Sequence, residues 1–295
     1  MNRNTNLPKI SIAYFKKKGK QKPKKSKENQ RFLACLNGSS EYYLNAKIED
    51  EKNMYIREIC YAGMTMEVCR YHAPNNRPRG MPRSKKEKLT REEQFRVNER
   101  QAEKKLRRLI NHNFGPGDYH LVLTYRKEDR PEDKERLAKD IRNFHIAMKK
   151  AYKKMGLEYK YIHVYEIGKR GALHHHLVVN KSDVDVIRKI WGKGRIRVSP
   201  LDDSCQYSEL ASYLIKYSSV MLRSEEKLQG KRWNASRNLK KPKVIKKPVI
   251  RNTFRKKHEE RKGWYIDKNM SCEYVDSMGY EHIQTIYIKT ERKRE

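Results

Sequence analysis

Residues 119–221 alternate between short apolar runs and segments of helical periodicity, and this ordered alternation limits the possible folds more than any other feature. Apolar, β-rich runs predict strands, whereas apolar residues spaced three and four apart predict helices. We expect strands at 119–125, 159–167, 173–179 and 195–199, and helices at 137–155, 183–191 and 208–221. The order β-α-β-β-α-β-α predicts an α+β fold of the ferredoxin-like, split βαβ type, with an antiparallel sheet, helices on one face and the other face open.

Local signals indicate where two helices begin. Thr90 and Glu93 form a T-x-x-E capping box, in which each side chain can satisfy a free backbone N–H of the first turn. This signal predicts a helix over about 90–113, before Gly115. Ser182 is the expected N-cap of the helix at 183–191.

The flanking segments differ from this patterned part. Ten Lys or Arg and a single acid among residues 1–30 predict a disordered basic arm. Strand character at 59–68, a loop at 73–86 and a C-terminal hairpin at 271–289 are further expectations. A second basic tract over a mixed loop occupies 222–262. We therefore divide the chain into an arm, an N-terminal extension, a core and a C-terminal extension at 1–30, 31–118, 119–222 and 223–295.

The net charge is the second constraint. The chain of 295 residues carries 70 Lys and Arg against 36 Asp and Glu, a formal charge of +34, with a mean hydropathy of −1.07. No run approaches the roughly 20 apolar residues of a membrane span, and we expect neither a membrane segment nor a signal peptide. Five scattered cysteines without a C-x-x-C pair fit a reducing cytoplasm better than a disulfide framework or zinc finger. Nucleic acid is the expected partner of such a charge, and solubility alone is the alternative.

A first group of candidate residues lies on two neighbouring strands of the predicted sheet. Side chains alternate along a strand, so His174 and His176 share one face while His175 points to the other. If the residue numbers across the hairpin sum to 340, Glu166 opposes His174 on the same face, and His163 points away. Two imidazoles and a carboxylate suit Mn²⁺ or Mg²⁺ with open coordination positions. The alternative is a set of solvated polar residues without a metal.

A second group lies on the helix that follows the fourth strand. Tyr213, Lys216 and Tyr217 stand at positions i, i+3 and i+4, which share one helical face. A phenol is a poor nucleophile at neutral pH, but a nearby cation or a metal-polarised phosphate offsets this. The alternative is that both tyrosines only pack on the sheet. Combined with the first group, a tyrosine attack on a phosphodiester would give a covalent 5′-phosphotyrosine and a free 3′-hydroxyl.

Three motifs in order resemble those of a known family. The run ALHHHLVV resembles the His-hydrophobe-His motif of the HUH endonucleases, with histidine in the middle position. HLVLTY at 120–125 is similar to their first motif, and YLIKY is similar to the Tyr-x-x-Lys-Tyr motif of rolling-circle replication initiators of small single-stranded DNA phages. The resemblance covers about residues 90–245, including KRWNASRNLKKP, which resembles a segment of phage-type and mobile-element initiators.

The resemblance implies a metal-dependent replication initiator (Rep) that nicks and rejoins single-stranded origin DNA to start rolling-circle replication. His174 and His176 would hold Mg²⁺ or Mn²⁺, with Glu166 as third ligand. Tyr213 and Tyr217 would be nucleophiles and Lys216 would position the phosphate, although Tyr217 is structural in the alternative reading. The expected setting is the cytoplasm of a bacterial host, where a host helicase and DNA polymerase are partners. The chain has no P-loop, so we expect neither a nucleotide cofactor nor a built-in helicase.

Basic residues after the tyrosine helix form a candidate phosphate-contacting surface, which would add affinity without reading sequence. They are Arg223, Lys231, Arg232, Arg237, Lys240 and Lys241. Trp233 and Trp264 are candidates for stacking on unpaired bases or for ordinary packing. A conjugative relaxase or HUH transposase would share the chemistry. A non-enzymatic RNA- or ssDNA-binding module is the alternative from another class, and it would carry aromatic residues on its central strands.

Overall fold

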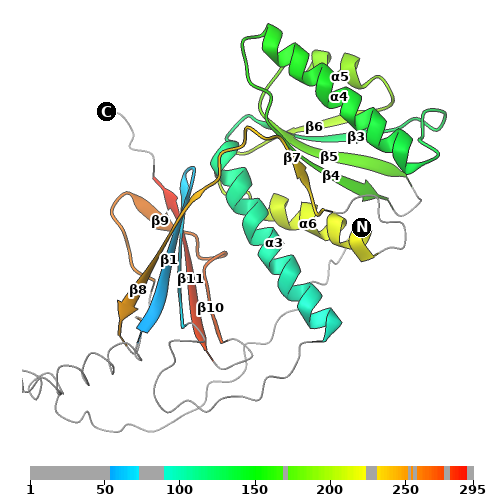
Figure 1. Ribbon diagram of the computed structural model, residues 1–295. Helices are drawn as coiled ribbons and strands as arrows, with labels where there is room; N and C mark the ends of the chain where they lie inside the picture. Colours follow the sequence, from blue (N-terminus) through cyan, green and yellow to red (C-terminus); the bar gives the residue numbers. More distant parts are fainter. Residues whose placement is uncertain are drawn as a thin grey trace, which may run out of the picture. The chain divides into compact units, whose positions relative to one another are not determined.

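The computed structural model describes residues 54–72, 90–168, 172–223, 231–251, 254, 258–275 and 280–290, and the side chains of 221–223 are not included. The expected arm at 1–30 and the expected loop at 73–86 lie outside these residues. The described part of the chain is α+β, with two antiparallel sheets and four helices (Figure 1). The predicted fold class is therefore confirmed.

The core sheet contains the elements that the periodicity predicts. Its strands are β3 (Tyr119–Thr124), β4 (Tyr161–Ile167), β5 (Leu173–Val179), β6 (Ile196–Pro200) and β7 (Asn234–Ala235). The helices between them are α4 (Lys134–Lys154), α5 (Val184–Trp191) and α6 (Ser208–Arg223). The strand order is β6-β3-β5-β4-β7, and each neighbouring pair is antiparallel. The first four strands thus have the arrangement of a split βαβ fold.

Helices α4 and α5 cover one face of the core sheet (Figure 1). Leu137, Phe144 and Met148 of α4 pack with Trp191 of α5 on the odd-numbered strand residues, such as Leu177. Helix α5 begins at Asp183, whose side chain accepts from the backbone N–H of Asp185. The expectation of Ser182 as N-cap is wrong by one residue, because the Asp183 carboxylate supplies the capping oxygen.

The opposite face is not open, contrary to the expectation from sequence. Helix α6 and the preceding helix α3 (Arg91–Asn113) pack on it through Leu214, Ile215 and Leu106. Their apolar partners are the even-numbered strand residues Ile162 and Val178. The apolar end of this face therefore requires a cover, which the two helices provide.

The capping box of α3 is present as predicted. The Thr90 hydroxyl accepts from the backbone N–H of Glu93, and the Glu93 carboxylate accepts from the backbone N–H of Thr90. Each side chain thus satisfies one of the free N–H groups at the start of the helix. The first turn of α3 is exposed, so these local bonds determine where it begins.

A second sheet joins strands from both flanks of the core, which the sequence did not predict. Its strands are β1 (Met54–Ala62), β2 (Thr65–Tyr71), β8 (Lys243–Ile250), β9 (Trp264–Ile266), β10 (Cys272–Val275) and β11 (Glu281–Lys289). The order is β10-β11-β2-β1-β8, and β9 also pairs with β11. The expected hairpin at 271–289 is confirmed by the pairing of β10 with β11. The single strand expected at 59–68 is wrong, because the chain turns at Gly63 and forms two strands, and β8 lies where a mixed loop was expected.

Gly63 explains the tight approach of this turn to α3. Its φ is +59°, and a Cβ atom there would lie 2.0 Å from the carbonyl oxygen of Asn111. The left-handed φ favours glycine, and the close backbone leaves no room for any other residue. The His112 ring adds a contact, since its Nδ1 lies 3.3 Å from the Gly63 backbone nitrogen.

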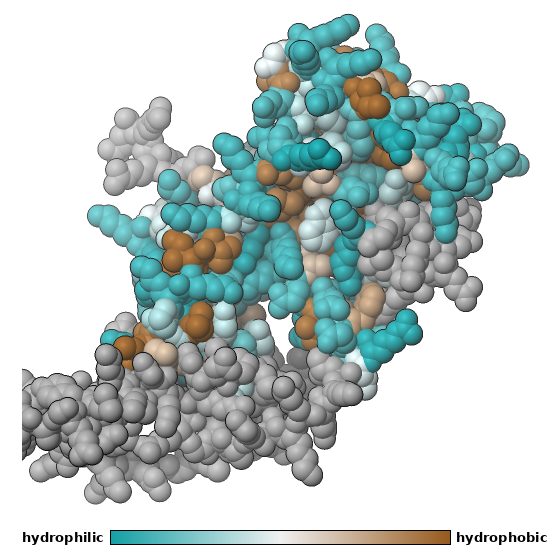
Figure 2. All heavy atoms as spheres, viewed as in Figure 1, coloured by the Kyte–Doolittle hydropathy of each residue, from teal (hydrophilic) through white to brown (hydrophobic). Residues whose placement is uncertain are grey.

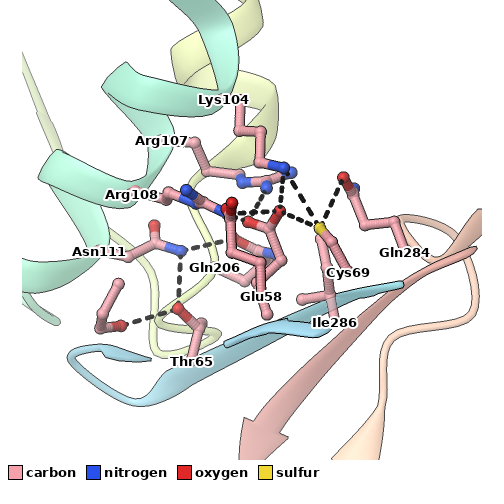
Figure 3. Close-up of polar contacts among 12 residues, drawn as sticks. Glu58, Thr65, Cys69, Lys104, Arg107, Arg108, Asn111, Gln206, Gln284 and Ile286 are labelled. Carbon is pink, nitrogen blue, oxygen red and sulfur yellow. Dashed lines mark hydrogen bonds and ion pairs between the residues drawn. The ribbon is translucent and has the colours of Figure 1, made fainter. Parts of the chain in front are cut away.

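A buried carboxylate connects the second sheet to α3. Glu67 of β2 is 5% exposed and contacts Lys104, Arg107 and Arg108 at 2.9, 2.5 and 3.0 Å (Figure 3). Arg108 also reaches Glu58 of β1 at 2.9 Å. These cations hold the pKa of Glu67 far below its usual range, although burial alone would raise it.

Hydrophilic residues dominate the described surface in Figure 2, with small and separate hydrophobic groups. This distribution agrees with the high content of charged residues, 36% of the chain. In the described part of the chain, no helix has the length and apolar character needed to span a membrane.

Candidate metal centre and tyrosine pair

Glu166, His174 and His176 gather on the even-numbered face of the core sheet. The β4–β5 register places Glu166 opposite His174 and Val164 opposite His176. The residue numbers across this ladder sum to 340, so the expected register is confirmed. The tight connection between the two strands sets this register, because a shift by one residue would move the histidines to the other face.

The three side chains offer ligand atoms to a common point. One atom from each of Glu166, His174 and His176 lies within 4.8 Å of the other two. His176 Nε2 contacts Glu166 Oε2, and His174 Nδ1 lies 3.7 Å from the same oxygen. A carboxylate and two imidazoles in this arrangement fit a divalent cation that keeps positions open for other oxygens.

Burial differs among the three donors and sets their charge. The side chain of His176 is 1% exposed, and burial lowers its pKa to about 4. Burial raises the pKa of Glu166, while the neighbouring His174 acts in the opposite direction. His174 is 29% exposed and is therefore the donor most accessible to solvent.

His120 of β3 is a member of this group that the sequence analysis missed. Its Nε2 lies 3.2 Å from His176 Nδ1, on the side of the ring away from Glu166. Burial, followed by the charge of His176, lowers the pKa of His120 to about 4. Pairing of Val122 with His176 puts His120 on the same face, so strand parity was the signal that could have found it.

Arg197 of β6 is a second residue that sequence reasoning missed. It pairs with Val122, which gives it the same face of the sheet as His176, and it is exposed. Its positive charge lowers the pKa values of His120 and Tyr213, although burial has the larger and opposite effect on Tyr213. The site thus includes a solvent-accessible cation beside the histidines.

Tyr213 and Tyr217 of α6 lie beside His176. The Tyr213 ring meets the His176 ring edge-on at 5.4 Å, and the Tyr217 ring stacks on it at 5.7 Å with an interplanar angle of 8°. Leu214 and Ile215 anchor α6 to the core, so the helix presents its tyrosines to the strand histidines. The structure therefore brings the two groups of candidate residues together.

The two tyrosines differ in accessibility. Tyr213 is 39% exposed, whereas Tyr217 is half-buried. Burial, together with a hydrogen bond from its neighbour Tyr217, raises the pKa of Tyr213 above its usual value. Lys216 is exposed one position before Tyr217. Of the two phenols, Tyr213 is thus the one that an incoming strand meets first.

His175 and His163 lie on the opposite face, as strand alternation predicts. His175 is fully buried, with its Nε2 2.9 Å from the Tyr125 hydroxyl and its Nδ1 3.1 Å from His163 Nε2. Burial lowers the pKa of His175 to about 3. These two histidines are neutral core residues held in place by hydrogen bonds.

The basic residues after α6 do not form a uniform surface. The exposed members are Lys231, Arg237, Lys240 and Lys241. Arg232 instead donates to the Ser219 hydroxyl at 2.6 Å and lies over the Phe95 ring at 5.0 Å, so it links the ends of α6 and α3. Trp233 packs against the core, and the side chain of Arg223 lies outside the described residues.

Comparison with known proteins gives one family. Residues 118–220, about a third of the chain, match the family model described as a replication-associated protein of the ORF2 type. No curated protein and no solved structure shows significant similarity to the chain. The matched residues contain the metal-ligand candidates and both tyrosines, and the match supports a Rep-type protein of rolling-circle replication.

Proposed function

We propose that this protein is a metal-dependent endonuclease and strand transferase that nicks and rejoins single-stranded DNA at a replication origin. The observation that carries the proposal is the position of His176. Its Nε2 contacts Glu166, while its ring lies within 5.4 Å of Tyr213 and 5.7 Å of Tyr217. A phosphodiester bound at this point would touch both the ligand group and a nucleophile.

Glu166, His174 and His176 are the residues that would hold Mg²⁺ or Mn²⁺. When bound, the cation would polarise the scissile phosphodiester and offset its negative charge. His120 holds the far nitrogen of His176 and so fixes the orientation of that ring. Arg197 would add a positive charge next to the phosphate.

Tyr213 is the proposed first nucleophile because it is the more exposed phenol. Its Oη forms a bond to phosphorus as the bond from phosphorus to the 3′-oxygen breaks. The phenol proton goes to solvent, and the leaving 3′-oxygen takes up a proton. The product is a 5′-phosphotyrosine and a 3′-hydroxyl, so the bond energy is conserved for the later rejoining step.

Tyr217 and Lys216 complete the proposed machinery. Tyr217 would accept the second strand in the transfer that closes the circle, and Lys216 would position the phosphate on the exposed side of α6. The exposed Lys231, Arg237, Lys240 and Lys241 would contact the backbone of the strand. A host helicase and polymerase would supply unwinding and synthesis, in the cytoplasm of a bacterial cell that carries a phage, plasmid or integrated element.

The test is formation of a covalent adduct. The full chain is incubated with Mn²⁺ and single-stranded DNA from the neighbourhood of its own gene, and a protein–DNA band is sought after boiling in detergent. We expect an adduct that EDTA, Tyr213→Phe or His174→Ala abolishes. Tyr265→Phe is the matched control, because Tyr265 is 48% exposed and lies on β9.

Two results would overturn parts of the proposal. If Tyr217→Phe alone removed the adduct, the roles of the two tyrosines would be reversed. If no cleavable DNA gave an adduct although salt-sensitive binding persisted, the protein would be a binding module. A relaxase or transposase would form the same adduct on transfer-origin or transposon-end DNA instead.

A further inference from the structure

Three aromatic rings form a row across the second sheet, far in sequence from the core motifs. Tyr71 of β2 pairs with His282 of β11, and His282 pairs with Tyr274 of β10. Directly paired residues point to the same face of a sheet, so the three side chains stand side by side. We call Tyr71, His282 and Tyr274 the aromatic row.

The rings of the aromatic row are parallel. The Tyr71 and His282 centroids are 5.8 Å apart with an interplanar angle of 11°, and those of His282 and Tyr274 are 4.8 Å apart at 4°. The row runs outward to β10, the edge strand of the sheet as described. Tyr274 is 50% exposed, so the outer end of the stack has accessible ring surface.

Cations surround the aromatic row. Lys246 hydrogen-bonds to Tyr71, and Lys104 and Arg100 of α3 lie close enough to act on the Tyr274 hydroxyl. The row lines a hollow of about 440 Å³ together with Lys104, Lys105 and Lys246.

The charge in this region is not balanced by the acids beside it. Two carboxylates face four cations, which leaves an excess of two positive charges; these residues are Glu58, Glu67, Lys104, Arg107, Arg108 and Lys246. The ion pairs of Glu67 and Glu58 are drawn in Figure 3. An anion that enters the hollow would therefore meet net positive charge.

We propose that the aromatic row and its cations bind single-stranded DNA, with an unpaired base stacked on Tyr274 and a neighbouring phosphate in the hollow. Stacked aromatic side chains beside positive charge are the general means by which proteins hold unpaired strands. This surface is separate from the cleavage site and rests on the proposed function only for DNA as the ligand. It gives the protein a second grip on the strand that it cuts.

The test measures equilibrium binding in EDTA, so that no cleavage occurs. Fluorescence anisotropy is recorded with three labelled ligands of equal length, namely a mixed-sequence single strand, the same strand with abasic sites, and a duplex. We expect Tyr274→Ala to weaken binding of the intact single strand about tenfold, as loss of one base–aromatic stack predicts. Binding of the abasic strand and of the duplex should not change, since neither offers an unpaired base.

Two variants control this measurement. Tyr274→Phe retains the ring and should bind the single strand as the wild type does. Tyr265→Ala removes an equally exposed tyrosine from β9 and should have no effect. Equal loss on intact and abasic strands, equal loss in Tyr265→Ala, or no loss in Tyr274→Ala would each overturn the proposal.

A second measurement does not depend on any variant. Photocross-linking of the wild-type protein to a strand that contains 5-iodouracil should label the peptide with residues 272–275, and absence of this label would also overturn the proposal. Both assays are independent of the covalent adduct. A protein that forms no adduct but needs Tyr274 for single-strand binding would refute the nuclease and keep this surface, and the reverse result would do the opposite.

Discussion

His120 Nε2 lies 3.2 Å from His176 Nδ1, so a residue of β3 holds the nitrogen of His176 that faces away from Glu166. A carboxylate only accepts, so His176 donates from Nε2 to Glu166 and its Nδ1 accepts from His120. Metal binding at Nε2 would require the His176 proton on Nδ1, where His120 Nε2 can accept it. His120 is thus a positioning residue for both forms of the ring.

His120→Ala should therefore lower the affinity for Mn²⁺ by about 10- to 100-fold, the usual effect of removing a hydrogen-bond partner of a metal ligand. Isothermal titration calorimetry with the full chain measures this without reference to cleavage. His120→Gln retains a polar group of similar reach and should recover part of the affinity. Unchanged affinity in His120→Ala would show that His176 needs no such partner.

Removal of one proposed ligand should abolish stabilisation by metal. In the wild type, Mn²⁺ at one hundred times its Kd should stabilise the folded state by about 2.7 kcal/mol and raise the Tm. His174→Ala should show no such rise, because one of three donors is lost, yet should fold, since His174 is partly exposed. His112→Ala, on α3 beside Gly63, is the matched control and should keep the full Mn²⁺-dependent rise.

Glu67→Gln should strongly destabilise the protein. Three cations surround this buried carboxylate, and breaking a buried ion pair costs about 3–5 kcal/mol. Glu92→Gln is the control, because the 3.5 Å pair of Glu92 with Arg96 is exposed and should contribute less than about 1 kcal/mol. Urea unfolding measures both, and a similar loss for the two variants would contradict the importance of the Glu67 cluster.

The same carboxylate predicts a pH dependence of stability. The pKa of Glu67 in the folded state lies below its ordinary value of 4.5, so its contribution is complete above that value. As the pH falls below 4.5 the unfolded chain takes up the proton first, and the contribution is progressively lost. Tm measured between pH 7 and pH 3 should therefore fall less steeply in Glu67→Gln than in the wild type.

Gly63→Ala tests the contact between the β1–β2 turn and α3. A Cβ atom at Gly63 would lie 2.0 Å from Asn111 backbone oxygen, so either the turn or the helix must move. Gly156 also has a positive φ, +70°, but no atom lies within 4 Å of its added Cβ. Gly156→Ala should cost only about 1–2 kcal/mol for the left-handed conformation, and Gly63→Ala should cost more. Equal losses in urea unfolding would argue against a tight contact.

The core sheet could be predicted from sequence because its signals are local. Spacings of three and four residues mark α4, and the short connection between β4 and β5 leaves one register that puts Glu166 opposite His174. Within α6, positions 213 and 217 are one turn apart and must share a face. These relationships follow from the geometry of one element or one hairpin.

The second sheet could not be predicted because its pairings are distant in sequence. β2 pairs with β11, more than two hundred residues later, and no local pattern encodes that contact. The strand β8, KVIKKPVI, resembles a basic tract since its lysines and Pro248 mask the alternation, and an edge position tolerates both. His120 was missed for a related reason, because its role depends on which strand lies beside β3.

Helix α3 has consequences for how the catalytic unit can be isolated. It buries Leu106 and Ile110 against the core sheet, and the residues of the family match begin only after it ends. An excised fragment limited to 118–220 would leave the partners of these side chains, such as Ile162 and Val178, in contact with water. The smallest piece that folds alone should therefore start at the Thr90 cap, and α3 would bring with it the unpaired cations that normally enclose Glu67.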